Sequence, residues 1–159
     1  MFRWINRYAI AVCILFAGGA AIAQPAQKIM APADAHSKAR AGEVVLVDIR
    51  TPEEWKETGV PASAHAITMN QDPRAFTTQL LNAMGGDRNR TVALICRTGN
   101  RSSALQAELN KAGFTAVVDV AEGMVGGRNG KGWIKSGLPT RPGSAASTQP
   151  MMEMKAGPK

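Results

Sequence analysis

Three short, largely apolar runs lie along the middle of the chain, at residues 44–47, 91–95 and 116–120. Each run is rich in β-branched residues. Such runs are typical of strands that are buried on both faces of a parallel sheet. A fourth, shorter strand is expected at residues 66–69.

Segments with helical patterning separate these runs, and some carry clear start signals. Thr51-Pro52-Glu53-Glu54 predicts a helix that begins with a capping box. Asp72-Pro73 predicts the start of another helix. Further helices are expected at residues 33–41 and 102–112. Because helices alternate with strands, the sequence predicts an α/β fold with a central, mainly parallel sheet flanked by helices.

Residues 1–23 have the three-part pattern of a secretory signal peptide. Arg3 and Arg7 provide the basic part, residues 9–20 the apolar part, and Ala21-Ile22-Ala23 the small-residue cleavage site. We expect cleavage after Ala23 and a periplasmic or secreted protein with no stable membrane span. An uncleaved N-terminal anchor is the alternative.

The net charge of the chain limits the classes of binding partner that we expect. The chain of 159 residues has a formal charge of +7, and removal of residues 1–23 leaves 136 residues with a charge of +5. The basic residues form no long run and are not interleaved with aromatic residues, so a nucleic-acid surface is not expected. Small anions or an acidic partner fit this charge better.

Cysteine usage draws attention to one side chain. Cys13 lies inside the signal peptide, so the mature chain keeps Cys96 alone and can form no internal disulfide. Exported compartments favour disulfides, and a lone thiol there is either buried and inert or retained for its chemistry. The residues around Cys96 are needed to choose between these two interpretations of the thiol.

Cys96 follows the strand at residues 91–95, at the end of the sheet where ligands of α/β folds collect. Glycine and asparagine in the next residues allow the loop to curl, and a curled row of amides at a helix N-terminus binds anions. We expect the sulfur at the rim of this cradle, where amides and arginines favour a thiolate. The loop is therefore a candidate site for a nucleophilic sulfur and an anionic donor, made by Cys96, Arg97, Thr98, Gly99, Asn100, Arg101 and Ser102.

A plainer interpretation of the same loop stays open on spacing alone. A cysteine at the end of a buried strand is often a small core residue. The two arginines can be solvated, and Gly99-Asn100 can be only a turn.

The chain resembles the rhodanese family over residues 30–139. The family pattern has a strand ending in Asp-x-Arg, a helix that begins Pro-Glu-Glu-Trp, an active loop Cys-x-x-Gly-x-Arg-Ser, and a closing Glu-Gly-Met, Trp and Gly-Leu-Pro. The matching positions are Asp48 and Arg50, residues 52–55, Cys96, Gly99, Arg101 and Ser102, residues 122–124, Trp133, and residues 137–139.

The resemblance implies a three-layer rhodanese-like domain and a sulfurtransferase that works through a persulfide. Cys96, as thiolate, would attack the outer sulfur of thiosulfate or a similar anionic donor, and the amides of residues 97–102 would hold the transferred sulfur. Cyanide, a thiol or a protein acceptor would then take it. Arg101 would order the loop and neutralise the donor, and Arg97 would help to attract it. No metal or organic cofactor is required.

Loop length separates activities within the family. Rhodanese-fold phosphatases and arsenate reductases carry one residue more than the six from Cys96 to Arg101. The shorter loop suits sulfur, so phosphatase activity is not expected.

The chain also departs from the family pattern. The usual Gly-His-Ile-Pro-Gly-Ala is replaced by residues 59–64, GVPASA, and His65 is displaced, so we assign His65 no catalytic role. His36 is expected on the surface. Asp48 and Arg50 are expected to pair near the sheet edge for structural reasons.

Several alternatives stay open. The domain can be a persulfide relay or binding module that serves a protein partner instead of turning over thiosulfate. The glycine-rich residues 125–132 can be a flap over the site or a loose connection. Residues 24–29 are expected to lead into the domain, and residues 140–159 to form a disordered tail, where Met151, Met152 and Met154 are a weak copper(I) candidate.

Overall fold

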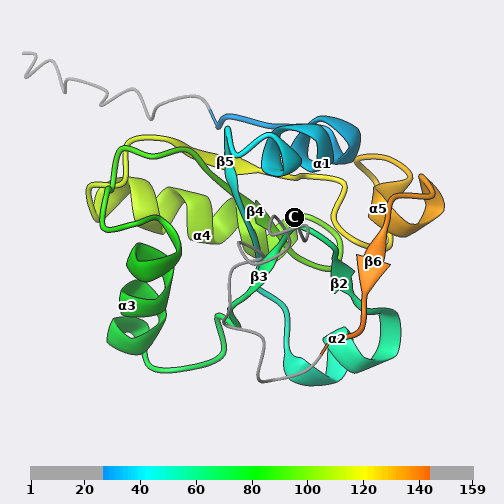
Figure 1. Cartoon of the computed structure of the whole chain (residues 1–159), viewed down its shortest axis with the longest axis horizontal. Helices are drawn as coiled ribbons and strands as arrows, with labels where there is room; N and C mark the ends of the chain where they lie inside the picture. The colour runs from blue at the N-terminus through cyan, green and yellow to red at the C-terminus, as the bar shows by residue number, and fades with distance from the viewer. Residues whose placement is uncertain (1–26, 144–159) are drawn as a thin grey trace, which may run out of the picture.

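A parallel sheet with the strand order β3-β1-β4-β5 forms the centre of the fold in the computed structural model (Figure 1). The structure describes residues 27–143. The predicted signal peptide and the methionines of the predicted tail lie outside the described residues. The sheet strands are β1 (Val45–Asp48), β3 (His65–Ala66), β4 (Val92–Ile95) and β5 (Val117–Asp119).

Helices connect and cover these strands, and two of them begin at the predicted start signals. Thr51 caps its helix by accepting from the N–H of Glu54, and the Glu54 side chain accepts from the N–H of Thr51, so the predicted capping box is confirmed. Asp72 caps the next helix with its side chain. The helices are α1 (Pro32–Arg40), α2 (Pro52–Thr58), α3 (Pro73–Ala83), α4 (Asn100–Lys111) and α5 (Gly132–Lys135).

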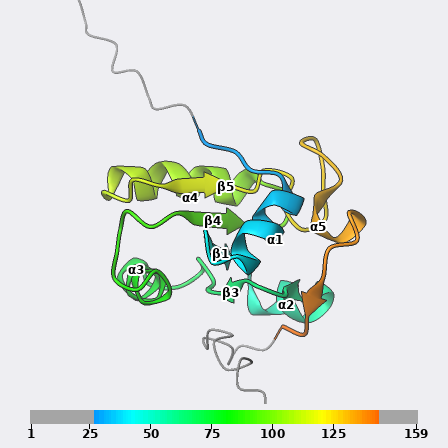
Figure 2. The ribbon, with the colours of Figure 1, turned by 45° about the horizontal axis from the view of Figure 1, so that its top comes forward.

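The predicted three-layer arrangement is confirmed, because alternate residues of each strand enter two different cores. Val45 and Val47 pack in a core that includes residues of α3 and α4. Leu46 packs on the other face of the sheet, in a core that includes Ala35 of α1 and Trp133 of α5. Figure 2 shows the two pairs of helices on either side of the sheet.

Two elements have a boundary that differs from the sequence prediction by two residues or more. The strand expected at residues 66–69 is only His65–Ala66, because the chain beyond it follows β1 past its end through single hydrogen bonds such as Ile67 N–H to Asp48 O, 3.0 Å. α4 begins at Asn100 rather than Ser102, since Gly99 already makes the turn into the helix.

A small antiparallel ribbon, absent from the sequence prediction, joins the chain just after α2 to residues 140–141. It pairs β2 (Val60–Pro61) with β6 (Thr140–Arg141), beside α2 (Figure 1). Arg141 also donates to the carbonyl of Ala64, 2.9 Å. The predicted domain end at Pro139 is therefore too early, and the expected disordered tail is wrong for its first residues.

Asp48 and Arg50 pair as expected, but in the interior rather than near the sheet edge. Both side chains are fully buried, and Arg50 Nη2 lies 2.7 Å from Asp48 Oδ2. Arg50 also donates to Thr58 Oγ1, 2.7 Å, and to Gly59 O, 2.6 Å. The pair thus connects the end of β1, an inner strand, to the end of α2.

The expectation of a surface position for His36 is only partly confirmed, because the residue is half-buried. Its ring lies edge-on against Trp133, with the ring centroids 5.7 Å apart, and its Nδ1 is buried. Among residues 27–143, no helix combines the length and the apolar character that a bilayer crossing requires.

Candidate active site

Cys96 lies directly after β4, and its sulfur is enclosed by the loop that follows. Sγ accepts a hydrogen bond from the N–H of Gly99, 3.2 Å, and one from Ser102 Oγ, 3.4 Å. The residue is only 1% exposed. The sulfur therefore lies at the floor of the loop, and the expected position at its rim is wrong.

The loop leaves a set of backbone donors without protein acceptors. Gly99 provides no side-chain cap for α4. Within residues 27–143, these N–H groups donate to no backbone or side-chain acceptor: those of Arg97, Thr98, Asn100, Arg101 and Ser102. Together with the positive end of the helix dipole, unpaired amides of this kind favour a negative charge.

Gly99 is required at its position for two reasons. Its φ of +95° lies in the region that favours glycine, and a Cβ there would collide with the carbonyl oxygen of Ala121. The loop and the end of β5 therefore touch through their backbones at Gly99.

The predicted Glu-Gly-Met motif supports the loop from outside. Met124 N–H donates to Cys96 O, 2.9 Å, and Val125 N–H donates to Arg97 O, 3.0 Å. Gly123 allows this approach, since a Cβ at that position would meet the carbonyl of Arg97. The motif thus fixes the first two peptide groups of the loop.

Residues 125–132 are anchored beside the loop. Asn129 Nδ2 donates to Ala121 O, 2.9 Å, and Gly132 N–H donates to Glu122 Oε2, 2.9 Å. A pocket of about 590 Å³ lies between this segment, the start of α4 and residues 27–31. Cys96 does not line that pocket.

The two loop arginines are paired with acids of α2. Arg101 makes a bidentate ion pair with Glu54, at 2.6 and 2.9 Å. Arg97, whose side chain is 44% exposed, lies 3.2 Å from Glu57 and 4.0 Å from Glu54. Sequence reasoning saw Glu54 only as part of a capping box, since nothing local reveals a partner in another helix.

The charges of this cluster act on one another. Partial burial alone would raise the pKa of Glu54, but hydrogen bonds from Arg101 and from the N–H of Thr51, with the nearby arginine charges, hold it below its ordinary value. The pKa of Arg101 is raised, first by its hydrogen bond to Glu54 and also by the charge of Glu54 and the Cys96 sulfur. Arg101 therefore remains a cation close to the sulfur.

Asp119, at the end of β5, is a second residue that sequence reasoning did not assign to the site. It is 3% exposed, and its Oδ1 is buried without a hydrogen-bond partner among the described residues. Burial raises its pKa, and a hydrogen bond with Ser102 opposes that rise. The sequence feature that could have pointed to Asp119 is that it is the single acidic residue inside the apolar run at residues 116–120.

The seven predicted site residues, 96–102, form the loop after β4 and the first turn of α4, where Gly99 and Ser102 donate to the sulfur. His65 lies elsewhere, in β3. A buried cysteine sulfur, a row of unpaired amides and a paired arginine define a loop that can hold a small anion against a nucleophile.

Comparison with known proteins agrees with this class of site. The chain matches the model of the rhodanese-like domain over residues 31–129. It is 34% identical over 113 residues to a chloroplastic thiosulfate sulfurtransferase of Arabidopsis thaliana, covering 67% of this chain and 87% of that protein.

Solved structures show the same fold. The polysulfide-sulfur transferase homodimer of Wolinella succinogenes superimposes with a TM-score of 0.56 at 24% identity, over 72% of this chain and 78% of that chain. A rhodanese-related protein of Thermoplasma volcanium gives a TM-score of 0.53 at 23% identity, over 72% and 97% of the two chains. The chain therefore belongs to the rhodanese-like domain family, and its relatives place it among sulfurtransferase-type proteins.

Proposed function

We propose that the protein is a sulfurtransferase that moves a sulfane sulfur from thiosulfate, or a similar small anionic donor, to a thiophilic acceptor through a persulfide on Cys96. The observation that carries the proposal is the position of Sγ inside a loop where five N–H groups have no acceptor among residues 27–143, while a sixth, that of Gly99, donates to the sulfur. The named sulfurtransferase among the relatives supports the same reaction class.

The reaction has two displacement steps. In the first, the Cys96 thiolate attacks the outer sulfur of thiosulfate, the sulfur–sulfur bond of the donor breaks, and sulfite leaves with the bonding electron pair. In the second, the acceptor attacks the terminal sulfur of Cys96–S–S⁻, and the electron pair of the broken bond returns to Sγ. With cyanide as acceptor the product is thiocyanate, and no net oxidation or reduction of the protein occurs.

The loop residues have separate roles in these steps. The unpaired amides of Arg97, Thr98, Asn100, Arg101 and Ser102 would stabilise the negative terminal sulfur, as oriented donors do for other developing anions. Arg101, held by Glu54, keeps a fixed positive charge beside the sulfur. Exposed Arg97 would attract the donor at a distance, an effect that weakens as salt increases.

The burial of Cys96 bears on the donor. Because the residue is 1% exposed, a narrow outer sulfur on a small anion fits the approach better than a bulky group.

We also propose that the chain is cleaved after Ala23 and exported to the periplasm or beyond. The proposed acceptor there is a thiol or a protein.

A thiosulfate–cyanide assay tests the proposal. Thiocyanate formation is expected from the wild type and from a Ser103→Ala control, whose hydroxyl donates to the Gln27 side chain. Cys96→Ser should form none above the uncatalysed rate. Equal rates for wild type and Cys96→Ser would overturn the proposal, whereas Cys96 persulfidation by a protein donor without thiosulfate turnover would favour a relay.

A further inference from the structure

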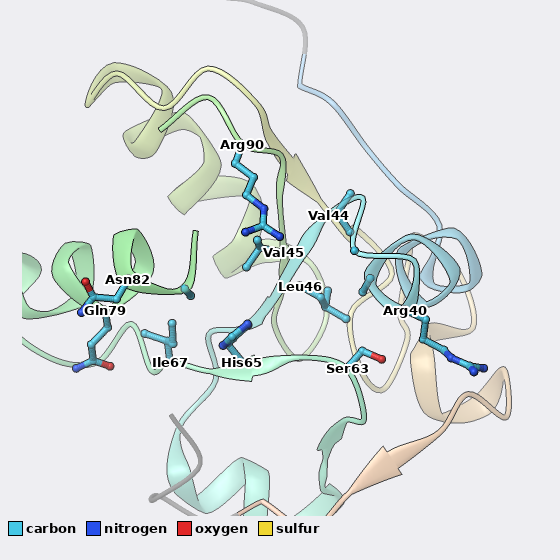
Figure 3. Close-up of a pocket in the computed structure, with 13 residues that line it drawn as sticks. Arg40, Val44, Val45, Leu46, Ser63, His65, Ile67, Gln79, Asn82 and Arg90 are labelled. Carbon is cyan, nitrogen blue, oxygen red and sulfur yellow. The ribbon is translucent and has the colours of Figure 1, made fainter. Parts of the chain in front are cut away.

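A second hollow lies beside the first half of β1, and Cys96 is not among the residues that line it. It has a volume of about 550 Å³, within the range of small-molecule sites. Its wall includes Val45 and Leu46 of β1 and Ile67 just after β3, with Gln79 and Asn82 of α3 on one side (Figure 3). Cys96 follows the opposite, carboxyl end of the parallel strands.

The shortness of β3 creates this hollow. β3 begins at His65 and pairs only with Val47 and Asp48, so the earlier residues of β1 have no neighbouring strand on that side. Leu46 is nearly fully buried, yet its backbone N–H has no acceptor among the described residues. A buried backbone donor without a partner is unusual and favours a ligand that carries an acceptor.

The charged side chains that line the hollow are all basic. Arg90 and His65 line it, with Arg40 at its rim, and no acidic residue is among its lining residues. Figure 3 shows the Arg90 guanidinium directed toward Val45, and neither Arg90 nor Arg40 makes a side-chain hydrogen bond or ion pair with residues 27–143. Burial lowers the pKa of His65, as do the charges of Arg141 and Arg90, so the Arg90 guanidinium lies close enough to act on this ring at the wall of the hollow.

We propose that this hollow is a binding site for a small organic anion, a carboxylate on a short apolar body. The carboxylate would accept from Arg90 and from the Leu46 N–H, and the apolar body would lie on Val45 and Ile67. The site is separate from Cys96 and does not depend on the sulfur-transfer proposal.

NMR titration of the purified protein with hexanoate tests this site. The chain has two histidines, and His36, packed on Trp133, serves as an internal reference. Hexanoate should shift the ring resonances of His65 saturably and raise the pKa of His65, because a nearby anion stabilises imidazolium. The resonances of His36 should not move. Shifts of both rings alike, or no saturable shift, would overturn the proposal.

Matched ligands and variants separate the parts of the site. Hexylammonium has the same apolar length and the opposite charge, so it should not bind, and inorganic phosphate should bind more weakly than hexanoate. Arg90→Gln should weaken hexanoate binding about tenfold, which is the usual effect of losing one charged hydrogen bond. Arg74→Gln is the control, because Arg74 lies on the exposed start of α3 outside the hollow, and it should leave hexanoate binding unchanged. Binding of hexylammonium or phosphate as tightly as hexanoate, or equal effects of the two variants, would contradict the site. Cys96→Ser should bind hexanoate as the wild type does.

Discussion

At the scale of single residues, Gly99 shows how the loop depends on backbone conformation. Its φ is positive, and the carbonyl of Ala121 occupies the place that any Cβ would need. Gly42 has a similar φ of +75°, but a Cβ there would meet nothing within 4 Å. Replacing each glycine with alanine therefore distinguishes two free-energy costs. At Gly42 only the backbone conformation is unfavourable, whereas at Gly99 the new Cβ also collides with Ala121.

Alanine at these two positions should have different effects on stability. Gly42→Ala should cost about 1 kcal/mol of unfolding free energy, the cost of the left-handed conformation alone. Gly99→Ala should cost at least about 2 kcal/mol more, since Ala121 or the loop must move, and sulfur transfer should fall with it. Chemical denaturation measures both, and equal losses would show that the contact with Ala121 is not a constraint.

At the scale of elements, Glu54 connects the start of one helix to the start of another. Its carboxylate closes the capping box of α2 and also holds Arg101 at the start of α4. The capping box is local and was predictable, whereas the second contact joins residues 47 positions apart and was not. One side chain thus ties the stability of α2 to the geometry of the active loop.

Glu54→Gln should therefore destabilise the protein in a pH-dependent way. The pKa of Glu54 is lowered in the folded protein, so its carboxylate contributes stability above pH 4.5, and that contribution is lost as the pH falls through the lower folded pKa. The difference in unfolding free energy between wild type and Glu54→Gln should be largest near pH 7 and shrink below pH 4.5.

Glu108→Gln is the matched control, because Glu108 forms an exposed ion pair with Lys111. Its effect should stay below about 0.5 kcal/mol. A pH-independent difference for Glu54→Gln would contradict the assigned role of the carboxylate.

At the scale of the whole molecule, local signals were enough for most of the framework. The apolar runs gave β1, β4 and β5, and the caps at Thr51 and Asp72 gave α2 and α3, because these signals are confined to neighbouring residues. The β2–β6 ribbon was missed because each strand has two residues and the pairing joins positions about 80 residues apart. The hollow beside β1 was missed because it depends on where β3 begins in space.

The sequence predicted which residues form the site better than it predicted how they are arranged in space. The seven residues 96–102 are contiguous, so the sequence could place them together. The burial of the sulfur, the pairing of both arginines with α2 and the position of Asp119 depend on tertiary contacts. These contacts decide how a donor reaches Cys96, and no local pattern encodes them.

The most direct test of the central claim is the mass of the intact protein after incubation with thiosulfate and removal of the excess. We predict an added mass of about 32 Da, one sulfur atom, on Cys96. That mass should disappear on addition of cyanide and should never form on Cys96→Ser. Thiocyanate production by a protein that never carries the added sulfur, or the same adduct on Cys96→Ser, would contradict the account.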